Sequence, residues 1–204
     1  SKDKEVGGEK MKFVHVSDLH LGKRVNEVSM IEEQRDMLNQ VIAFLKEENP
    51  DGMLIAGDIY DRNIPSEEAV SLFDFFLNEV VSLKLPVYLI SGNHDSGERL
   101  RFGAKLLEKN QLFFSTVYQG EVPSFTMEDE YGFVVIHLLP FVKPAQVRSY
   151  FPKEEIKDYN DALRVVVEHM NIDNSKRNVL VAHQLITGAT RSDSEEIWVG
   201  GQEN

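Results

Sequence analysis

The chain has 204 residues and a formal net charge of −12, with 34 acidic residues against 22 Lys and Arg. Its lack of cysteine excludes a disulfide framework, a thiolate metal site and a cysteine nucleophile. The acidic balance argues against a free-standing nucleic-acid binder, because phosphate contacts need Lys and Arg, but not against an enzyme that meets phosphate through bound cations.

The length suits a single domain, or one large domain with part of a second. We predict that the domain spans residues 11–204 and that residues 1–10 are a tag or an N-terminal extension. No apolar run approaches the ~18–20 residues that a membrane-spanning helix needs, and residues 1–10 contain no hydrophobic signal core. We therefore expect a cytoplasmic protein without a membrane partner.

Apolar strands alternate with amphipathic helices over the first half of the chain. We predict strands at 12–17, 52–58 and 86–91, and helices at 29–50, 65–83 and 97–109. Ser66 suits the N-cap of the second helix, because its hydroxyl can accept a backbone N–H bond. Continuous apolar strands that alternate with helices predict a largely parallel sheet covered by helices.

The second half of the chain has a different pattern. Short apolar segments and turn residues at 111–141 predict a more antiparallel region or a second sheet. A further helix is predicted at 157–171, and a further buried strand at 177–184.

Polar side chains follow four of the predicted strands. The carboxyl ends of parallel strands lie at one edge of a sheet, which is where open α/β sheets bind their ligands. The metal-binding side chains at these strand ends are Asp18, His20, Asp58, Asn93 and His183. Imidazole, carboxylate and amide ligands without sulfur suit Mn²⁺, Fe²⁺ or Zn²⁺. The sequence therefore indicates a metal centre built from residues that are far apart along the chain.

Each candidate residue, taken alone, also has a structural explanation. A single histidine, for example, is more often a hydrogen-bonded core residue than a metal ligand. We interpret His15 and His137, inside predicted strands, as structural. We interpret His169, near a helix end, as a solvated or dipole-pairing residue. Lys23 and Arg24 come shortly after Asp18 and His20 and could contact the phosphates of DNA, although a solvated pair is the simpler interpretation. Four predicted strands in succession each end in potential metal ligands. This combination favours a metal centre over a chance arrangement of polar residues.

Four segments carry a resemblance to a known family: "MKFVHVSDLHLGKRV", "DGMLIAGDIYDRNIPSEEAVSLF", "PVYLISGNHDSGERLRFGAKLL" and "VLVAHQLITGATRSDSE". They resemble the calcineurin-like metallophosphoesterases, and within these the nucleases of double-strand-break repair complexes. The resemblance covers residues 11–204. It implies an α/β fold, a four-layer α-β-β-α sandwich with two central mixed β-sheets.

Matching positions imply a role for each candidate ligand. By this resemblance, Asp18 and His20 ligate one divalent ion and Asp58 bridges two ions. Asn93 and His183 ligate the second ion. The resemblance implies Mn²⁺ as the metal, in a two-metal mechanism for phosphodiester hydrolysis.

The resemblance also implies roles for three residues that do not bind metal. His94 stabilises the transition state or protonates the leaving oxygen. Asp61 and Asp95 are outer groups that orient the ligands.

The implied function is that of a DNA nuclease subunit, an exonuclease and endonuclease for double-stranded ends and hairpins in DNA repair, replication and recombination. The implied partners are double-stranded DNA, an ATPase subunit and a second copy of the chain. Two alternatives stay open. One is a phosphodiesterase or phosphatase for a small molecule, which would use the same metal pair. The other is a non-catalytic scaffold that binds DNA ends.

The chain departs from the family pattern near its end. The G-H-x-H motif, which completes both metal sites in the family, does not occur in it. By this resemblance, we expect the capping domain and the segment that engages the ATPase to lie outside this chain. We therefore expect 11–204 to be a C-terminally incomplete domain with weakened metal binding and activity. We also expect an uncovered sheet edge that promotes self-association.

Overall fold

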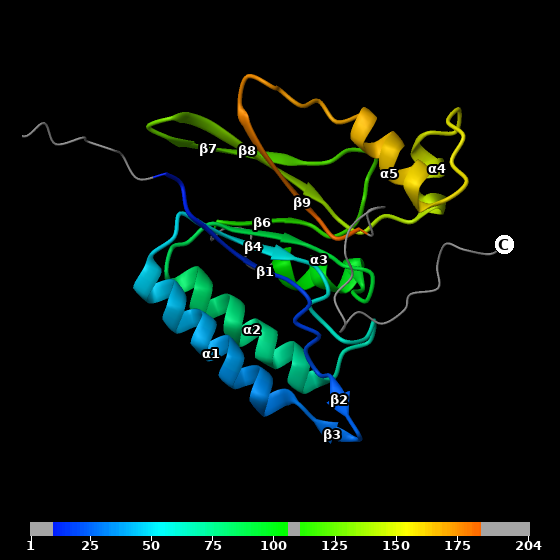
Figure 1. The fold of residues 1–204 in the computed structure, drawn as a ribbon. Helices are drawn as coiled ribbons and strands as arrows, with labels where there is room; N and C mark the ends of the chain where they lie inside the picture. Colours follow the sequence, from blue (N-terminus) through cyan, green and yellow to red (C-terminus); the bar gives the residue numbers. More distant parts are fainter. Residues whose placement is uncertain (1–9, 106–110, 185–204) are drawn as a thin grey trace, which may run out of the picture.

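Two β-sheets packed face to face form the centre of the molecule (Figure 1). The computed structural model describes residues 10–105 and 111–184. The predicted tag and the segment ending in "TRSDSE" therefore lie largely outside the described residues, and the domain boundaries stay a prediction. The apolar side chains between the sheets are Leu54, Ala56, Tyr88 and Ile90 from the first sheet, and Val134, Ile136, Leu138 and Val181 from the second. This arrangement confirms the predicted α/β sandwich with two central sheets.

The first sheet has the strand order β1-β4-β5-β6 and is parallel over the described residues, whereas the resemblance implies a mixed sheet. Its strands are β1 (Phe13–Val16), β4 (Gly52–Ala56), β5 (Val87–Ile90) and β6 (Leu112–Ser115). Every residue of β4 and β5 is buried, as their continuous apolar runs predict. The prediction of an antiparallel region or second sheet at 111–141 is wrong for β6. This strand pairs in parallel with β5, because the crossover that contains α3 (Gly97–Lys105) returns the chain to the same edge.

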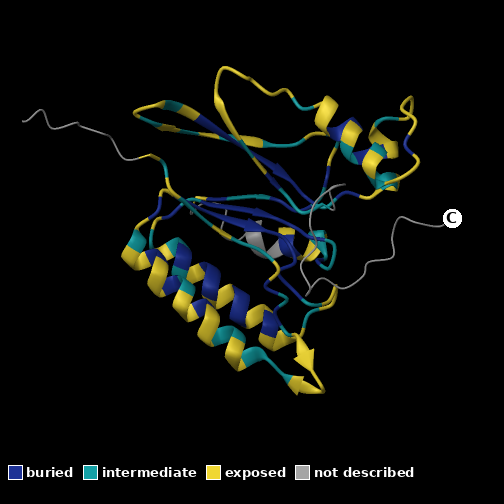
Figure 2. Cartoon of the chain, viewed as in Figure 1, coloured by how far each residue is buried: buried dark blue, intermediate teal, exposed yellow. Residues whose placement is uncertain are grey.

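Helices α1 (Ile31–Glu48) and α2 (Glu67–Ser82) cover the outer face of the first sheet (Figure 1). Figure 2 shows that each helix has one buried and one exposed side. Ser66 is the N-cap of α2, as predicted, and its Oγ accepts the N–H of Ala69 at 3.2 Å. The helix layer thus packs on the sheet with apolar stripes of helical period.

Two neighbouring phenylalanines of α2 provide a matched test of this packing. Phe76 is 0% exposed and Phe75 is 40% exposed. We expect Phe76→Ala to lower the free energy of unfolding by ~3–5 kcal/mol, because it leaves a cavity. Phe75→Ala should lower it by about 1 kcal/mol or less. Urea denaturation of both variants measures the difference, and equal losses would contradict the packing of α2.

The second sheet is mixed and has the strand order β7-β8-β9. Strand β7 (Ser124–Asp129) is antiparallel to β8 (Gly132–Leu139), and β9 (Arg177–Ala182) is parallel to it. The prediction of a buried strand at 177–184 is wrong in its burial. Leu180 is 46% exposed, because β9 is the edge strand of the sheet over the described residues.

Two elements escaped the sequence analysis. One is the short hairpin of β2 (Arg24–Val25) and β3 (Val28–Ser29), which precedes α1. The other is α4 (Pro144–Tyr150), which has proline in its first turn and packs with α5 (Tyr159–Glu168). Their common core includes Leu139 at the end of β8, so these helices cover the end of the second sheet.

Two of the three histidines outside the predicted site, His137 and His169, have structural surroundings. His137 is buried in β8, and its Nε2 lies 2.9 Å from Asn178 Oδ1, which confirms its structural interpretation. His169 is the C-cap of α5, with Nδ1 2.8 Å from the carbonyl oxygen of Val165, so it lies at a helix end as predicted. His15 lies in β1 and is exposed.

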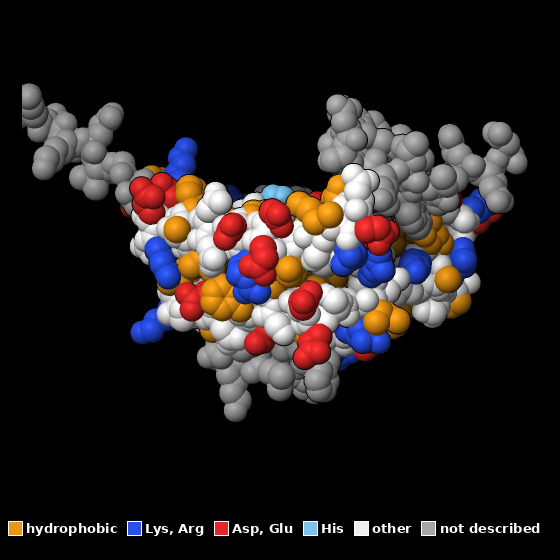
Figure 3. Space-filling model, turned by 90° about the horizontal axis from the view of Figure 1, so that it is seen from below, with side chains coloured by type: hydrophobic (Ala, Val, Ile, Leu, Met, Phe, Trp, Pro, Cys, Tyr) orange, Lys and Arg blue, Asp and Glu red, His pale blue; other side chains and the backbone are white. Residues whose placement is uncertain are grey.

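The outer face of α1 and α2 carries side chains of both charges, with apolar side chains between them (Figure 3). Lys46 and Glu79 form an ion pair of 3.6 Å between the two helices. A face of mixed charge offers no continuous basic track of the kind that DNA backbones bind. Over residues 10–105 and 111–184, no helix combines the length and the apolar character needed to cross a bilayer.

Candidate metal centre

The loops that follow β1 and β4 run side by side at the carboxyl edge of the first sheet. Three backbone hydrogen bonds join them, from Asp18 N–H to Gly57 O (3.1 Å), His20 N–H to Asp58 O (3.0 Å) and Leu21 N–H to Ile59 O (2.9 Å). These bonds extend the pairing of the two strands and bring Asp18 and His20 beside Asp58.

Three candidate ligands have a left-handed backbone. The φ angle is 55° at Asp18, 42° at His20 and 49° at Asp58. Such conformations are uncommon for residues other than glycine, although Asp and His adopt them more readily than most. They cost of order 1–3 kcal/mol each and persist only where the surrounding contacts fix them. Their concentration in two adjacent loops is typical of a binding site.

Asp58 lies at the centre of the cluster and is 3% exposed. Its Oδ2 is 3.4 Å from His183 Nε2, 3.7 Å from His20 Nε2 and 4.0 Å from His94 Nε2. Its Oδ1 accepts the backbone N–H of His94 at 2.9 Å. One carboxylate oxygen therefore faces three imidazole nitrogens, which come from the loop after β1, the loop after β5 and the residue after β9.

Two groups of side chains have the spacing of metal ligands. One is His20, Asp58 and His94, and the other is Asp18, Asp58 and His183, with ligand atoms within 4.8 Å of one another in each group. Asp58 belongs to both groups, which suits a carboxylate that bridges two cations. The nitrogen and oxygen donors fit Mn²⁺, Fe²⁺ or Zn²⁺. The geometry sets His94 beside His20, whereas the resemblance pairs Asp18 with His20, so the assignment of ligands to ions stays a prediction.

All three rings present Nε2 to the central carboxylate. His183 Nδ1 lies 2.7 Å from Ala56 O, and His94 Nδ1 lies 3.2 Å from Asp61 O. A carbonyl only accepts hydrogen bonds, so Nδ1 carries the proton and the neutral ring has its lone pair at Nε2. His20 Nδ1 is buried without a hydrogen-bond partner in the described chain, and Asp61 Oδ1 lies 3.8 Å from it. These rings are oriented as metal-binding histidines are.

Asp58 and His183 stabilise each other's charge. Burial opposes the charge on Asp58, but the hydrogen bonds from His183 and from the backbone of His94 outweigh it and lower the pKa of Asp58. Burial also opposes the charge on His183, but its hydrogen bond and attraction to Asp58 raise the pKa of His183 to about 9. A divalent cation would displace the extra proton that gives His183 its charge, because a histidine ligand must be neutral.

Asp95 ties the loop after β5 to the loop after β4. Its buried carboxylate accepts backbone N–H bonds from Gly92 (2.8 Å), Tyr60 (3.0 Å) and Ile59 (3.2 Å). Burial raises the pKa of Asp95, and these three donors act in the opposite direction. A Cβ at Gly92 would lie 2.1 Å from Asp58 Oδ1, so the two loops approach closely only because glycine occupies this position.

The remaining predicted site residues lie around this centre. Asp61 contacts His94 through its carbonyl and faces His20 through its carboxylate. Asn93 is half-buried immediately before His94, and its role as a ligand stays a prediction. Lys23 and Arg24 are exposed at and beside β2, where the guanidinium of Arg24 donates to the carbonyl of Glu27. Their contact with DNA stays a prediction as well.

Two amide side chains that the sequence analysis missed hold these loops. Gln34 of α1 bonds to the loop after β1. Asn63, with its amide nitrogen oriented toward carbonyl acceptors, donates to His94 O (2.9 Å) and Asp95 O (3.3 Å). Both bind backbone atoms, and no sequence motif marks such contacts.

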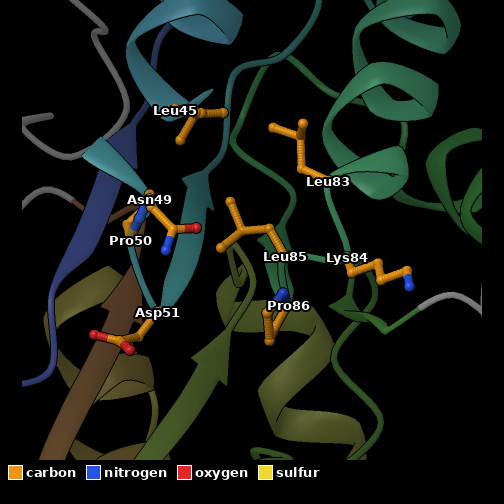
Figure 4. Close-up of a pocket in the computed structure, with 8 residues that line it drawn as sticks. All are labelled: Leu45, Asn49, Pro50, Asp51, Leu83, Lys84, Leu85 and Pro86. Carbon is orange, nitrogen blue, oxygen red and sulfur yellow. The ribbon is translucent and has the colours of Figure 1, made fainter. Parts of the chain in front are cut away.

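A small hollow of about 160 Å³ lies at the amino ends of β4 and β5, away from the strand ends that carry the candidate ligands (Figure 4). Leu45, residues 49–51 and residues 83–86 line it. No histidine lines it, and Asp51 accepts the backbone N–H of Lys12 at 2.7 Å. The hollow thus lacks the convergent ligands of the metal centre.

The fold and this cluster together define an α/β sandwich with a candidate metal centre at its strand ends. The family model of the calcineurin-like phosphoesterases matches residues 11–203, and the chain belongs to this family. The family depends on divalent metals, and the described residues contain two groups that could hold them.

One relative within this family can be compared with the chain over most of its length. The chain is 39% identical over 188 residues to SbcD of the nuclease SbcCD from Staphylococcus epidermidis, a match that covers 91% of this chain and 49% of that protein. The chain therefore spans about half the length of this relative.

Two solved structures are also similar. YfcE, a phosphoesterase from E. coli, has 18% identity and a TM-score of 0.35, over 65% of this chain and 58% of that one. A dimetal phosphatase from Danio rerio has 15% identity and a TM-score of 0.43, over 78% and 52%.

Proposed function

We propose that the chain is the catalytic region of a metal-dependent DNA nuclease, which hydrolyses phosphodiesters at double-stranded ends and hairpins. The observation that carries this proposal is Asp58, a buried carboxylate whose Oδ2 faces three imidazole nitrogens. The 39% identity to a protein of a nuclease complex supports DNA as the substrate. The proposed setting is DNA repair, replication and recombination in the cytoplasm, with an SbcC-like ATPase subunit and a second copy of the chain as partners.

The proposed ligands are Asp18, His20, Asp58, Asn93 and His183, and the proposed metal is Mn²⁺. Two bound cations would neutralise the phosphate charge and lower the pKa of the attacking water. The closeness of the ligand atoms in the two groups supports Asp18, His20, Asp58 and His183 as ligands, whereas Asn93 belongs to neither group.

His94 is the proposed acid of the reaction. Its Nδ1 is held by the carbonyl of Asp61, and its Nε2 faces the centre. A bond forms between the oxygen of water and phosphorus while the bond from phosphorus to the leaving oxygen breaks. The protonated ring of His94 gives its proton to that leaving oxygen, and the proton from water passes to solvent.

A comparison of substrates tests the proposed function. The longest natural chain that contains these residues is incubated with linear duplex DNA, hairpin DNA and bis-p-nitrophenyl phosphate, each with Mn²⁺ or Mg²⁺. We expect cleavage of both DNA substrates with Mn²⁺ and none after chelation. Hydrolysis of the small ester alone would indicate a small-molecule phosphodiesterase, and DNA binding without any hydrolysis would indicate a scaffold.

A further inference from the structure

We propose that Gln34 is a positioning residue for His20, an inference that rests on the proposed metal centre. His20 lies in the loop after β1, which is bound on one side by the loop after β4. Its other side meets the first turn of α1, where Gln34 is half-buried. The loop is therefore held between the sheet edge and a helix.

The side chain of Gln34 makes three hydrogen bonds to this loop. Its Nε2 donates to His20 O (2.8 Å) and to Leu19 O (3.2 Å), and its Oε1 accepts the N–H of Gly22 (2.9 Å). An amide has two N–H donors and one carbonyl acceptor, so every group of the side chain is engaged. All three bonds reach backbone atoms, and they fix the chain on both sides of His20.

These bonds hold a backbone that is unfavourable by itself. The φ angle is 42° at His20 and 86° at Gly22, both in the left-handed region. A histidine stays in that region only where surrounding contacts over-determine it. The N–H of His20 binds Asp58 O on the inner side, and Gln34 binds the outer side. Together they aim the ring, whose Nε2 lies 3.7 Å from Asp58 Oδ2.

Two substitutions of Gln34 test its donor and acceptor hydrogen bonds to the loop. Gln34→Met keeps the length of the side chain and removes all three hydrogen bonds. Gln34→Glu keeps an acceptor for Gly22 but sets a carboxylate oxygen against the carbonyls of Leu19 and His20. The matched control is Gln40→Met, because Gln40 is exposed on the same helix.

Mn²⁺ titration followed by electron paramagnetic resonance gives the first readout. We expect Gln34→Met and Gln34→Glu to weaken the binding of one Mn²⁺ by at least about tenfold, the size found for groups that orient metal ligands. Gln40→Met should bind as the unchanged chain does. Equal affinity in all variants would overturn the proposal.

Amide hydrogen exchange at Gly22 in the metal-free chain gives the second readout. Exchange should accelerate in Gln34→Met, which frees this N–H, and stay slow in Gln40→Met. Faster exchange with unchanged Mn²⁺ affinity would mean that Gln34 holds the loop without positioning the ligand, which also overturns the proposal.

A third measurement separates the role of Gln34 from the proposed function, in the case that the chain binds no Mn²⁺. If the unchanged chain binds no Mn²⁺, the proposed function fails, and the imidazole NMR signals of His20 in the metal-free chain decide the positioning role. Signals that shift in Gln34→Met but not in Gln40→Met support it. Signals that stay unchanged in both variants overturn it.

Discussion

Replacing Asp58 with asparagine should reduce DNA cleavage by roughly 10³-fold or more, at least the size of effect that removal of one transition-state contact has in other enzymes. Asparagine has the same shape and can still accept the backbone N–H of His94 through its oxygen. It removes the negative charge that three imidazole nitrogens surround. Because Asp58 belongs to both groups of candidate ligands, the substitution should weaken both cation sites at once.

The loss has to be separated from a general effect of removing an acidic charge. Asp74→Asn is the matched control, because Asp74 is exposed on α2. Cleavage of linear duplex DNA and Mn²⁺ binding are measured for both variants. Retention of two Mn²⁺ ions and of the cleavage rate in Asp58→Asn would contradict the assignment of Asp58 as a bridging ligand.

The parts of the fold that could be predicted are those in which burial determines the pattern of apolar residues along the sequence. Strands β4 and β5 are buried on both faces, so their residues are apolar without interruption. Strand β6 could not be assigned to its sheet, because pairing partners are not encoded in hydropathy. Strand β9 looks like a buried strand in sequence, but Leu180 faces outward at a sheet edge.

The convergence of the candidate ligands was predictable for a geometric reason. Asp58 and His183 are far apart along the chain, yet each follows the carboxyl end of a strand, β4 in the first sheet and β9 in the second. The packing of one sheet on the other brings these two ends together. The neighbours of these residues were not predictable. Gln34 and Asn63 donate to backbone carbonyls, which no sequence pattern identifies. The left-handed conformations of the loop that Gln34 binds cannot be read from residue types either.

The role of His94 is the point at which the geometry and the resemblance differ. Its Nε2 lies in one group with His20 and Asp58, as a metal ligand would. Its ring packs edge-on against His20 with 5.0 Å between the ring centroids, as a neighbouring acid could. A ligand and a proton donor respond differently to substitution, so kinetics and metal binding can decide between them.

We expect His94→Gln to lower kcat on DNA by about 10²–10⁴-fold, the usual contribution of a general acid, and to leave Mn²⁺ affinity unchanged. The rate on bis-p-nitrophenyl phosphate should fall much less, because nitrophenolate leaves without a proton whereas the alkoxide of a sugar needs one. His15→Gln is the control, since His15 is exposed in β1. Weaker Mn²⁺ binding with equal losses on both substrates would make His94 a ligand. The proton for the leaving oxygen would then have to come from another group or from solvent.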